Sequence, residues 1–191
     1  MGLEWSPAIE RPMAMSPDPS PSLEARLVVA ARDGDRDAFG RLYARYAPMV
    51  HGLLLARAPR REVEDLVHDV FLQALRRLSS LRDPERFGPW LATIARNRAA
   101  DYHRRPSTPE TIDLPDELPG GAKPEAEALA ALAVIRSLPE AYRETLVLRL
   151  VEGMSGPEIA DRTGLTPGSV RVNLHRGMRM LREALSKGAN P

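Results

Sequence analysis

The sequence predicts an all-α fold of two small helical domains joined by a flexible linker. Apolar residues recur at three- and four-residue spacing on both sides of an acidic stretch that is rich in proline and glycine. Near the C-terminus, a Gly-centred turn at Gly164 is followed by a helix that carries arginines. The chain has 191 residues, 43% of them hydrophobic, which is enough for two small cores.

The first domain is expected at residues 23–105, after a disordered tail at 1–22 that is rich in proline. Gly34-Asp35 separates its first two helices. A third helix, Glu62 to Leu78, has the clearest apolar stripe, and a fourth runs from Phe87 to Arg105 and ends before Pro106. The stripe of the third helix consists of Val63, Leu66, Val67, Val70, Phe71, Ala74, Leu75 and Leu78.

Residues 106–124 are expected to form an acidic flexible linker, because prolines and a Gly-Gly pair exclude regular structure there. The second domain then spans 125–187. Its helix starts are predicted at two capping boxes, Ser137 to Glu140 and Ser155 to Glu158, and at Thr166-Pro167.

The segment from Ser155 to Arg171 has the pattern of a helix-turn-helix, which lays its second helix in a DNA groove. On a helix over 167–185, one face is apolar and the other polar. The candidate base readers on the polar face are Ser169, Val172, Asn173 and Arg176, and the candidate phosphate contacts on its flanks are Arg171, His175, Arg179 and Arg182. The alternative is a surface amphipathic helix with solvated arginines.

The third helix carries an exposed leucine among carboxylates, which is typical of a protein-docking face. Angular spacing groups Asp65, His68, Asp69 and Leu72 opposite the apolar stripe. An ordinary solvated face is the simpler alternative. A metal site that uses Glu64 beside the same acidic residues and His68 is a weaker one, because no second histidine accompanies it, and no metal or cofactor is expected.

Charge and cysteine content restrict the function further. The net charge is only +1, but basic residues concentrate in 93–105 and 165–187 and acidic ones between them, so a nucleic-acid surface has to come from segregated charge. The chain has no cysteine and no apolar N-terminal run. A cytoplasmic protein without membrane insertion, disulfides or thiolate chemistry is therefore expected.

Two sequence blocks resemble the extracytoplasmic-function sigma factors, small members of the sigma-70 family. Asp65 to Leu72, Trp90 to Asn97 and Asp101 to Arg105 resemble their domain 2. Leu138 to Glu140 and the helix-turn-helix residues up to Arg176 resemble their domain 4. The blocks appear in the family's order and spacing over about 23–105 and 129–185.

The resemblance implies a role for each block in starting transcription rather than in catalysis. Domain 2 would dock on the β′ clamp helices of RNA polymerase through Asp65, His68, Asp69 and Leu72. The minus-10 element would be bound by Arg96, Asn97, Arg104 and Arg105, with Asn97 holding a base that leaves the stack. Domain 4 would read the minus-35 element and pack on the β flap, and the linker would run through the RNA exit path. An anti-sigma factor is a further implied partner.

The sequence departs from the family pattern at two places. His68 stands where Gln is usual, and Val172-Asn173 replaces a small polar and basic pair, so the minus-35 sequence cannot be carried over. Arg98 and Asp101 are interpreted as a structural ion pair.

The alternative functions for the whole chain are a free-standing helix-turn-helix repressor or activator, a helical adaptor, and a hydrolase built on the carboxylates near His68. None of them explains both sequence blocks.

Overall fold

The computed structural model describes residues 21–104 and 123–188, and within these ranges it is helical, as the sequence predicts. Within each of the two ranges, short turns and two 3-10 segments, Leu78–Ser80 and Pro84–Arg86, connect the helices. The α-helices are α1 (Leu23–Arg32), α2 (Arg36–Leu55), α3 (Arg60–Arg77), α4 (Phe87–Arg104), α5 (Lys123–Ser137), α6 (Glu140–Leu150), α7 (Gly156–Thr163) and α8 (Pro167–Gly188).

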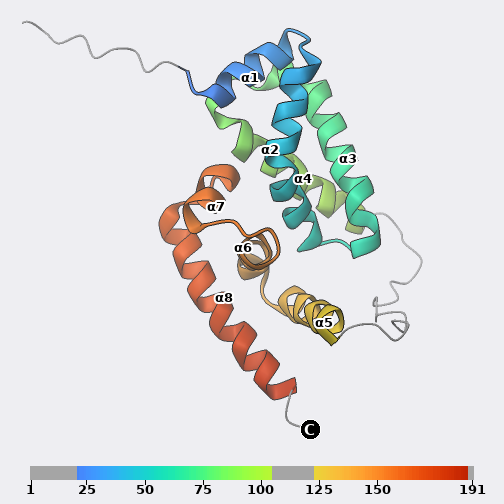
Figure 1. The fold of residues 1–191 in the computed structure, drawn as a ribbon, viewed down its shortest axis with the longest axis vertical. Coiled ribbons are helices and arrows are strands. Elements are labelled where there is room, and N and C mark those ends of the chain that lie inside the picture. The colour runs from blue at the N-terminus through green and yellow to red at the C-terminus, as the bar shows by residue number, and fades with distance from the viewer. Residues whose placement is uncertain (1–20, 105–122, 189–191) are drawn as a thin grey trace, which may run out of the picture.

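The N-terminal domain, α1 to α4, is organised around α2 (Figure 1). Asp35 begins α2 by accepting hydrogen bonds from the amides of Asp37 and Ala38. The buried face of α2 packs against α1, α3 and α4, and the Tyr46 and Phe87 rings meet edge to face with centroids 5.2 Å apart. This arrangement fixes α3 and α4, the two helices that carry the predicted docking and minus-10 residues.

The C-terminal domain, α5 to α8, contains the predicted helix-turn-helix in α7 and α8. The capping box at Ser155 and Glu158 is present, which confirms the predicted start of α7. Gly164 ends that helix in the left-handed conformation, with a φ of 76°. Gly177 lets α8 approach α6, since a Cβ there would lie 3.0 Å from the Leu146 side chain.

Two predictions about local structure are wrong. Ser137 is the last residue of α5 rather than a cap, and α6 begins after Pro139 without a side-chain cap, because the fixed φ of proline suits the position just before a helix. Leu75, assigned to the apolar stripe of α3, is 47% exposed. It lies one turn from the exposed Leu72, where no helix of the described residues covers α3.

The two domains touch each other, which the expectation of a flexible linker does not anticipate. Helices α6 and α7 lie against α2 and α4 (Figure 1). Glycines make this approach possible: a Cβ on Gly52 would lie 2.8 Å from Leu148, one on Gly88 would lie 3.0 Å from the Arg162 carbonyl, and one on Gly164 would lie 2.9 Å from Pro89. The helix-turn-helix therefore rests on the start of α4.

Replacing Gly164 by alanine should destabilise the chain more than replacing Gly153. Both glycines have positive φ, so each alanine variant loses about 1 kcal/mol to backbone strain. Only at Gly164 must the added methyl group also displace Pro89, whereas nothing lies within 4 Å of a Cβ on Gly153. Urea unfolding of both variants measures the difference; equal losses would show that the contact with Pro89 contributes nothing.

Candidate nucleic-acid interface

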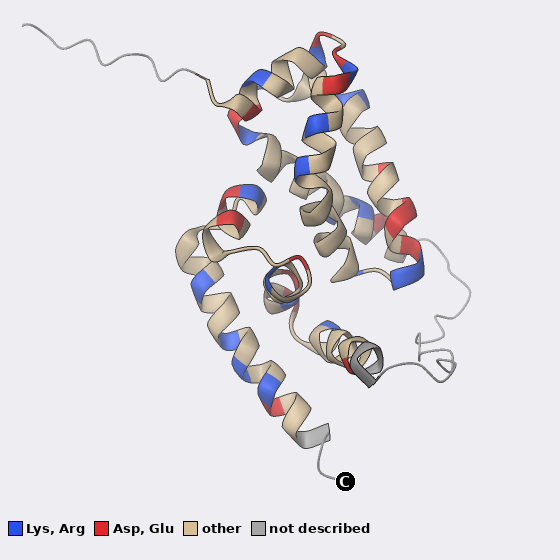
Figure 2. Ribbon diagram, viewed as in Figure 1, with Lys and Arg blue, Asp and Glu red and all other residues tan. Residues whose placement is uncertain are grey.

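The predicted reading face of α8 points away from the rest of the protein. The blue segments of Figure 2, which mark Lys and Arg, recur along α8, and Glu183 is the acidic residue among them. Of the predicted contacts, Asn173 is half-buried and the others are exposed: Ser169, Arg171, Val172, His175, Arg176, Arg179 and Arg182. The Ser169 amide and hydroxyl both bond Thr166 Oγ1, at 3.1 and 2.8 Å, so this serine helps to begin the helix.

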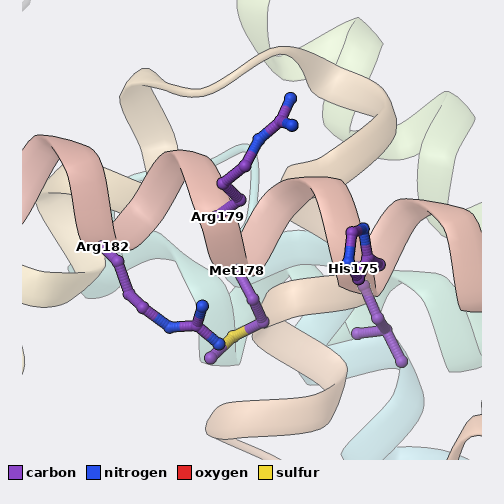
Figure 3. A pocket seen from close by; sticks show the side chains of 5 residues that line it. His175, Met178, Arg179 and Arg182 are labelled. Carbon is purple, nitrogen blue, oxygen red and sulfur yellow. The ribbon is translucent and has the colours of Figure 1, made fainter.

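A shallow pocket on α8 combines apolar and basic side chains. It is lined by Leu174, His175, Met178, Arg179 and Arg182. In Figure 3 the Arg182 side chain lies beside Met178, while Arg179 projects from the opposite side of the helix. The two arginines thus reach to different sides, which suits contacts with separate phosphates along a groove.

The predicted docking face of α3 is exposed, but one of its acidic residues is held from within the domain. Asp65, His68 and Leu72 are exposed. Asp69 is bonded by the Arg98 guanidinium of α4, with Nε 3.2 Å from Oδ2. Leu75 extends the apolar surface next to Leu72, and the sequence interpretation missed it.

The predicted ion pair between Arg98 and Asp101 is wrong. Arg98 faces α3 and pairs with Asp69, and Asp101 pairs instead with Arg104, three residues along the same helix. The reason is direction: Arg98 is half-buried between α3 and α4, whereas Asp101 lies on the exposed side of α4. Arg104, a predicted minus-10 contact, is therefore paired, although the pair is exposed to solvent.

The other predicted minus-10 residues differ in their surroundings. Asn97 is exposed on α4, as a residue that captures a base should be. Arg96 precedes it, but its guanidinium turns toward the C-terminal domain. Arg105 lies outside the described residues, as do most of the predicted tail and most of the predicted linker.

Glu144 of α6 is the acidic residue that Arg96 contacts, and Arg57 at the end of α2 contacts it as well. Arg96 Nε lies 3.1 Å from Glu144 Oε2 and Arg57 Nη2 lies 3.0 Å from the same oxygen. Arg96 Nη2 bonds the other carboxylate oxygen, which makes the pair bidentate. Arg57 also bonds Glu140 at 3.0 Å. Two cations of one domain thus converge on one carboxylate of the other.

Burial and charge act in opposite directions on Glu144. Its residue is only 6% exposed, and burial alone would raise the pKa of the carboxyl group. The hydrogen bonds and charges of Arg96 and Arg57 outweigh that effect and hold the pKa below its usual value. Glu144 is therefore ionised where it is buried. In the sequence, the only sign of this role is that Glu144 stands beside a buried apolar run, Leu146 to Leu148. Its arginine partners lie on other helices and could not be identified from its own.

A second polar contact between the domains joins His51 of α2 to Glu152, which follows α6. His51 Nδ1 lies 2.6 Å from Glu152 Oε1, and Glu64 lies farther off at 3.9 Å from Nε2. The hydrogen bond to Glu152 raises the pKa of His51, and burial opposes that rise without cancelling it. Arg60 also faces the imidazole and lowers its pKa slightly.

The described part of the chain carries neither a metal-binding cluster nor a membrane-spanning helix. No group of three or more histidine and acidic side chains there is arranged to hold a metal ion, so the carboxylates near His68 do not form such a site. Across residues 21–104 and 123–188, every helix is too short or too polar to span a bilayer.

The contact between His51 and Glu152 should stabilise the chain more at about pH 6 than at about pH 9. Because the folded pKa is raised, the contribution is complete below the unfolded value of about 6.5 and is lost as pH rises through the folded pKa. The melting temperature of the unmodified chain should therefore fall between about pH 6 and about pH 9 by an amount that His51→Asn does not show. His68→Asn, which replaces an exposed histidine, is the control and should keep this pH dependence. Identical pH profiles of melting for all three chains would show that the contact between His51 and Glu152 does not cause it.

Comparison with known protein families agrees with both halves of the structure. Sigma-70 region 2 matches residues 42–108, and Sigma-70 region 4 matches residues 128–181. The first match covers most of α2 with all of α3 and α4, and the second covers most of α5, all of α6 and α7, and most of α8.

Similar proteins match over most of the chain. The RNA polymerase sigma factor CarQ of Myxococcus xanthus is 38% identical over 82% of this chain and 94% of its own length. The ECF RNA polymerase sigma-E factor of Escherichia coli K12 is 34% identical over 86% and 93%. The structure of CnrH in complex with the cytosolic domain of CnrY matches with a TM-score of 0.62 and 27% identity, over 88% of this chain and 99% of that one. The chain therefore belongs to the extracytoplasmic-function group of the sigma-70 family, the RNA polymerase sigma factors that recognise promoters and initiate transcription.

Proposed function

We propose that this sigma factor uses three separate surfaces: α3 for core polymerase, α4 for the minus-10 element and α8 for the minus-35 element. The observation that carries the proposal is that the predicted contact residues on these helices are mostly exposed while their opposite faces are buried. In this assignment domain 2 is residues 23–105, domain 4 is 125–187, and residues 106–124 link them through the RNA exit path.

The α8 surface suits duplex DNA. A recognition helix enters the major groove with its N-terminal half against base edges. Val172 is 42% exposed and can contact a thymine methyl group, Asn173 suits adenine, and Arg176 suits guanine. Ser169 is better assigned to the phosphate backbone or to positioning, because its hydroxyl already bonds Thr166.

The α4 surface suits an opened strand. The exposed amide of Asn97 offers both a donor and an acceptor, which a base flipped out of the duplex can use on its Watson-Crick edge. Arg96, Arg104 and Arg105 would hold phosphates of the same strand. Opening the duplex costs stacking energy, which these contacts offset, and no covalent step is required, so the protein acts as a binding subunit rather than as an enzyme.

The α3 surface suits a protein partner, the β′ clamp helices of core polymerase. Leu72 and Leu75 form an exposed apolar pair beside Asp65, and such an anchor with charged surroundings is typical of interfaces. His68 would add a contact at its edge. Asp69 has two roles in this proposal: it contacts polymerase, and its ion pair with Arg98 holds α3 against α4.

Two further aspects of the function rest on family membership. We propose that the protein acts in the cytoplasm, where core polymerase and promoter DNA are found. We also propose an anti-sigma factor as a partner that withholds it from polymerase; the similar chain CnrH has been solved in complex with the cytosolic domain of CnrY.

Core polymerase supplied with this chain should initiate run-off transcription from a subset of promoters in a genomic pool. Asn97→Ala should reduce permanganate-reactive open complex about tenfold, because the captured base loses its hydrogen bonds, while core binding stays unchanged. Thr93→Ala, at an exposed position one turn earlier on α4, is the control. No initiation from any promoter would refute the proposed function, and equal permanganate reactivity of both variants would refute the role of Asn97.

Leu72→Ala should weaken binding to core polymerase about tenfold, since a central apolar anchor contributes about 1 to 2 kcal/mol at an interface. Val29→Ala removes an apolar side chain of similar exposure on α1 and should leave affinity unchanged. Both variants should melt like the unmodified chain because both side chains are on the surface. Titration of labelled core measures the affinities, and equal affinity for the two variants would remove α3 from the interface.

A further inference from the structure

The compact arrangement cannot contact both promoter elements at once. By their names the elements lie about 25 base pairs apart, which is about 85 Å along a duplex. Gly164, just before α8, touches Pro89 in the first turn of α4. Arg176 and Asn97 are therefore separated by at most roughly 40 Å of loop and helix, measured through that contact. The domains must separate before α4 and α8 can reach their two elements.

Separation removes Glu144 from its two arginine partners. The Arg57 and Arg96 side chains, 13% and 29% exposed in the contact, belong to the N-terminal domain, while Glu144 leaves with α6. Two guanidinium groups that share one carboxylate then remain side by side without it. Water replaces the carboxylate at these groups, and two adjacent positive charges on an exposed surface attract another anion.

The geometry left behind fits a phosphate group. Arg96 grips the two carboxylate oxygens with Nε and Nη2, the fork that arginine also presents to phosphate. Arg57 stays in place through its own domain: its Nη1 lies 3.3 Å from the Leu53 carbonyl, and its own carbonyl lies 2.7 Å from His103 Nε2. Asn97, the proposed base contact, is the residue after Arg96.

We propose that Arg57 and Arg96 together form a site for a backbone phosphate of promoter DNA, and that Glu144 occupies this site in the compact arrangement. The inference deepens the proposed function, on which it rests for the role of α4, and adds Arg57 to the DNA-binding residues. Closure of the two domains and binding of the opened strand therefore compete for the same two arginines, and opening of the domains favours DNA binding: DNA takes over the cations that Glu144 releases.

The first test uses the full-length chain and a single-stranded oligodeoxythymidylate, because a phosphate contact does not depend on promoter sequence. Glu144→Gln keeps the side-chain size but removes the competing charge. It should bind the oligonucleotide several-fold more tightly than the unmodified chain in fluorescence anisotropy. Glu140→Gln, at the exposed partner of Arg57, should change affinity far less. Equal affinity of Glu144→Gln and the unmodified chain would overturn the competition.

The second test places arginine variants in the Glu144→Gln background, where loss of the ion pair itself no longer contributes. Arg57→Gln and Arg96→Gln should each weaken binding and reduce the slope of log affinity against log salt by about 1. Arg57→Lys should retain part of the affinity, because it keeps the charge but not the fork. Arg41→Gln, on an exposed turn of α2, is the control. An unchanged affinity and slope for Arg57→Gln would remove Arg57 from the site.

Two further arms identify the ligand and the opening. Inorganic phosphate should compete with the oligonucleotide only weakly; strong, Arg57-dependent binding of inorganic phosphate without DNA binding would assign the site to a small anion instead.

The chain has no cysteine, so Ser79→Cys and Ser186→Cys allow a pair of dyes, one on each domain. Energy transfer should fall in Glu144→Gln and on adding the oligonucleotide. Unchanged energy transfer in both cases would overturn the link between opening of the domains and DNA binding. None of these experiments requires a promoter, so their failure can be told apart from failure of the proposed function.

Discussion

The burial of one carboxylate between two guanidinium groups is the constraint on which the arrangement of the two domains depends. Glu144 is ionised in a place nearly closed to water, and that is tolerable only while Arg57 and Arg96 remain beside it. The surrounding joint is polar as well, with His51 on Glu152 and Arg136 donating to the Leu55 and Ala58 carbonyls. Apolar side chains also lie at the joint, with Leu148 beside Gly52 and Pro89 beside Gly164, but the ion pairs are the part of it in which another anion can replace the carboxylate.

Tight backbone approach is the second condition for the compact arrangement. Gly52 and Gly88 lie on helices of the N-terminal domain where a side chain would meet the other domain, although neither has an unusual backbone conformation. Their role is steric: they allow α6 and α7 to approach α2 and α4 closely enough for the ion pairs to form. The same sequence therefore specifies two helical domains whose facing surfaces fit together, and their buried apolar residues form one continuous cluster.

Much of the fold could be predicted from local patterns. The stripe on α3, the cap at Ser155 and the turn at Gly164 are short-range signals, and the structure contains all three. Errors arose where the answer depends on distant residues. Arg98 pairs with Asp69 of another helix rather than with a residue of its own. Glu144 forms its ion pairs with arginines that lie 87 and 48 residues away in the sequence. The exposure of Leu75 likewise depends on which helices cover α3, which periodicity cannot reveal.

The free outer face of α3 has a consequence for the order of assembly. Helices α6 and α7 press on α2 and α4, and they leave Leu72 and Leu75 uncovered. The proposed contact with core polymerase therefore does not require the domains to separate first. If α3 is the docking face that we propose, polymerase binds the compact protein through α3 and holds its N-terminal domain while the DNA displaces the C-terminal one, so that reading of the opened strand begins on the enzyme rather than in free solution.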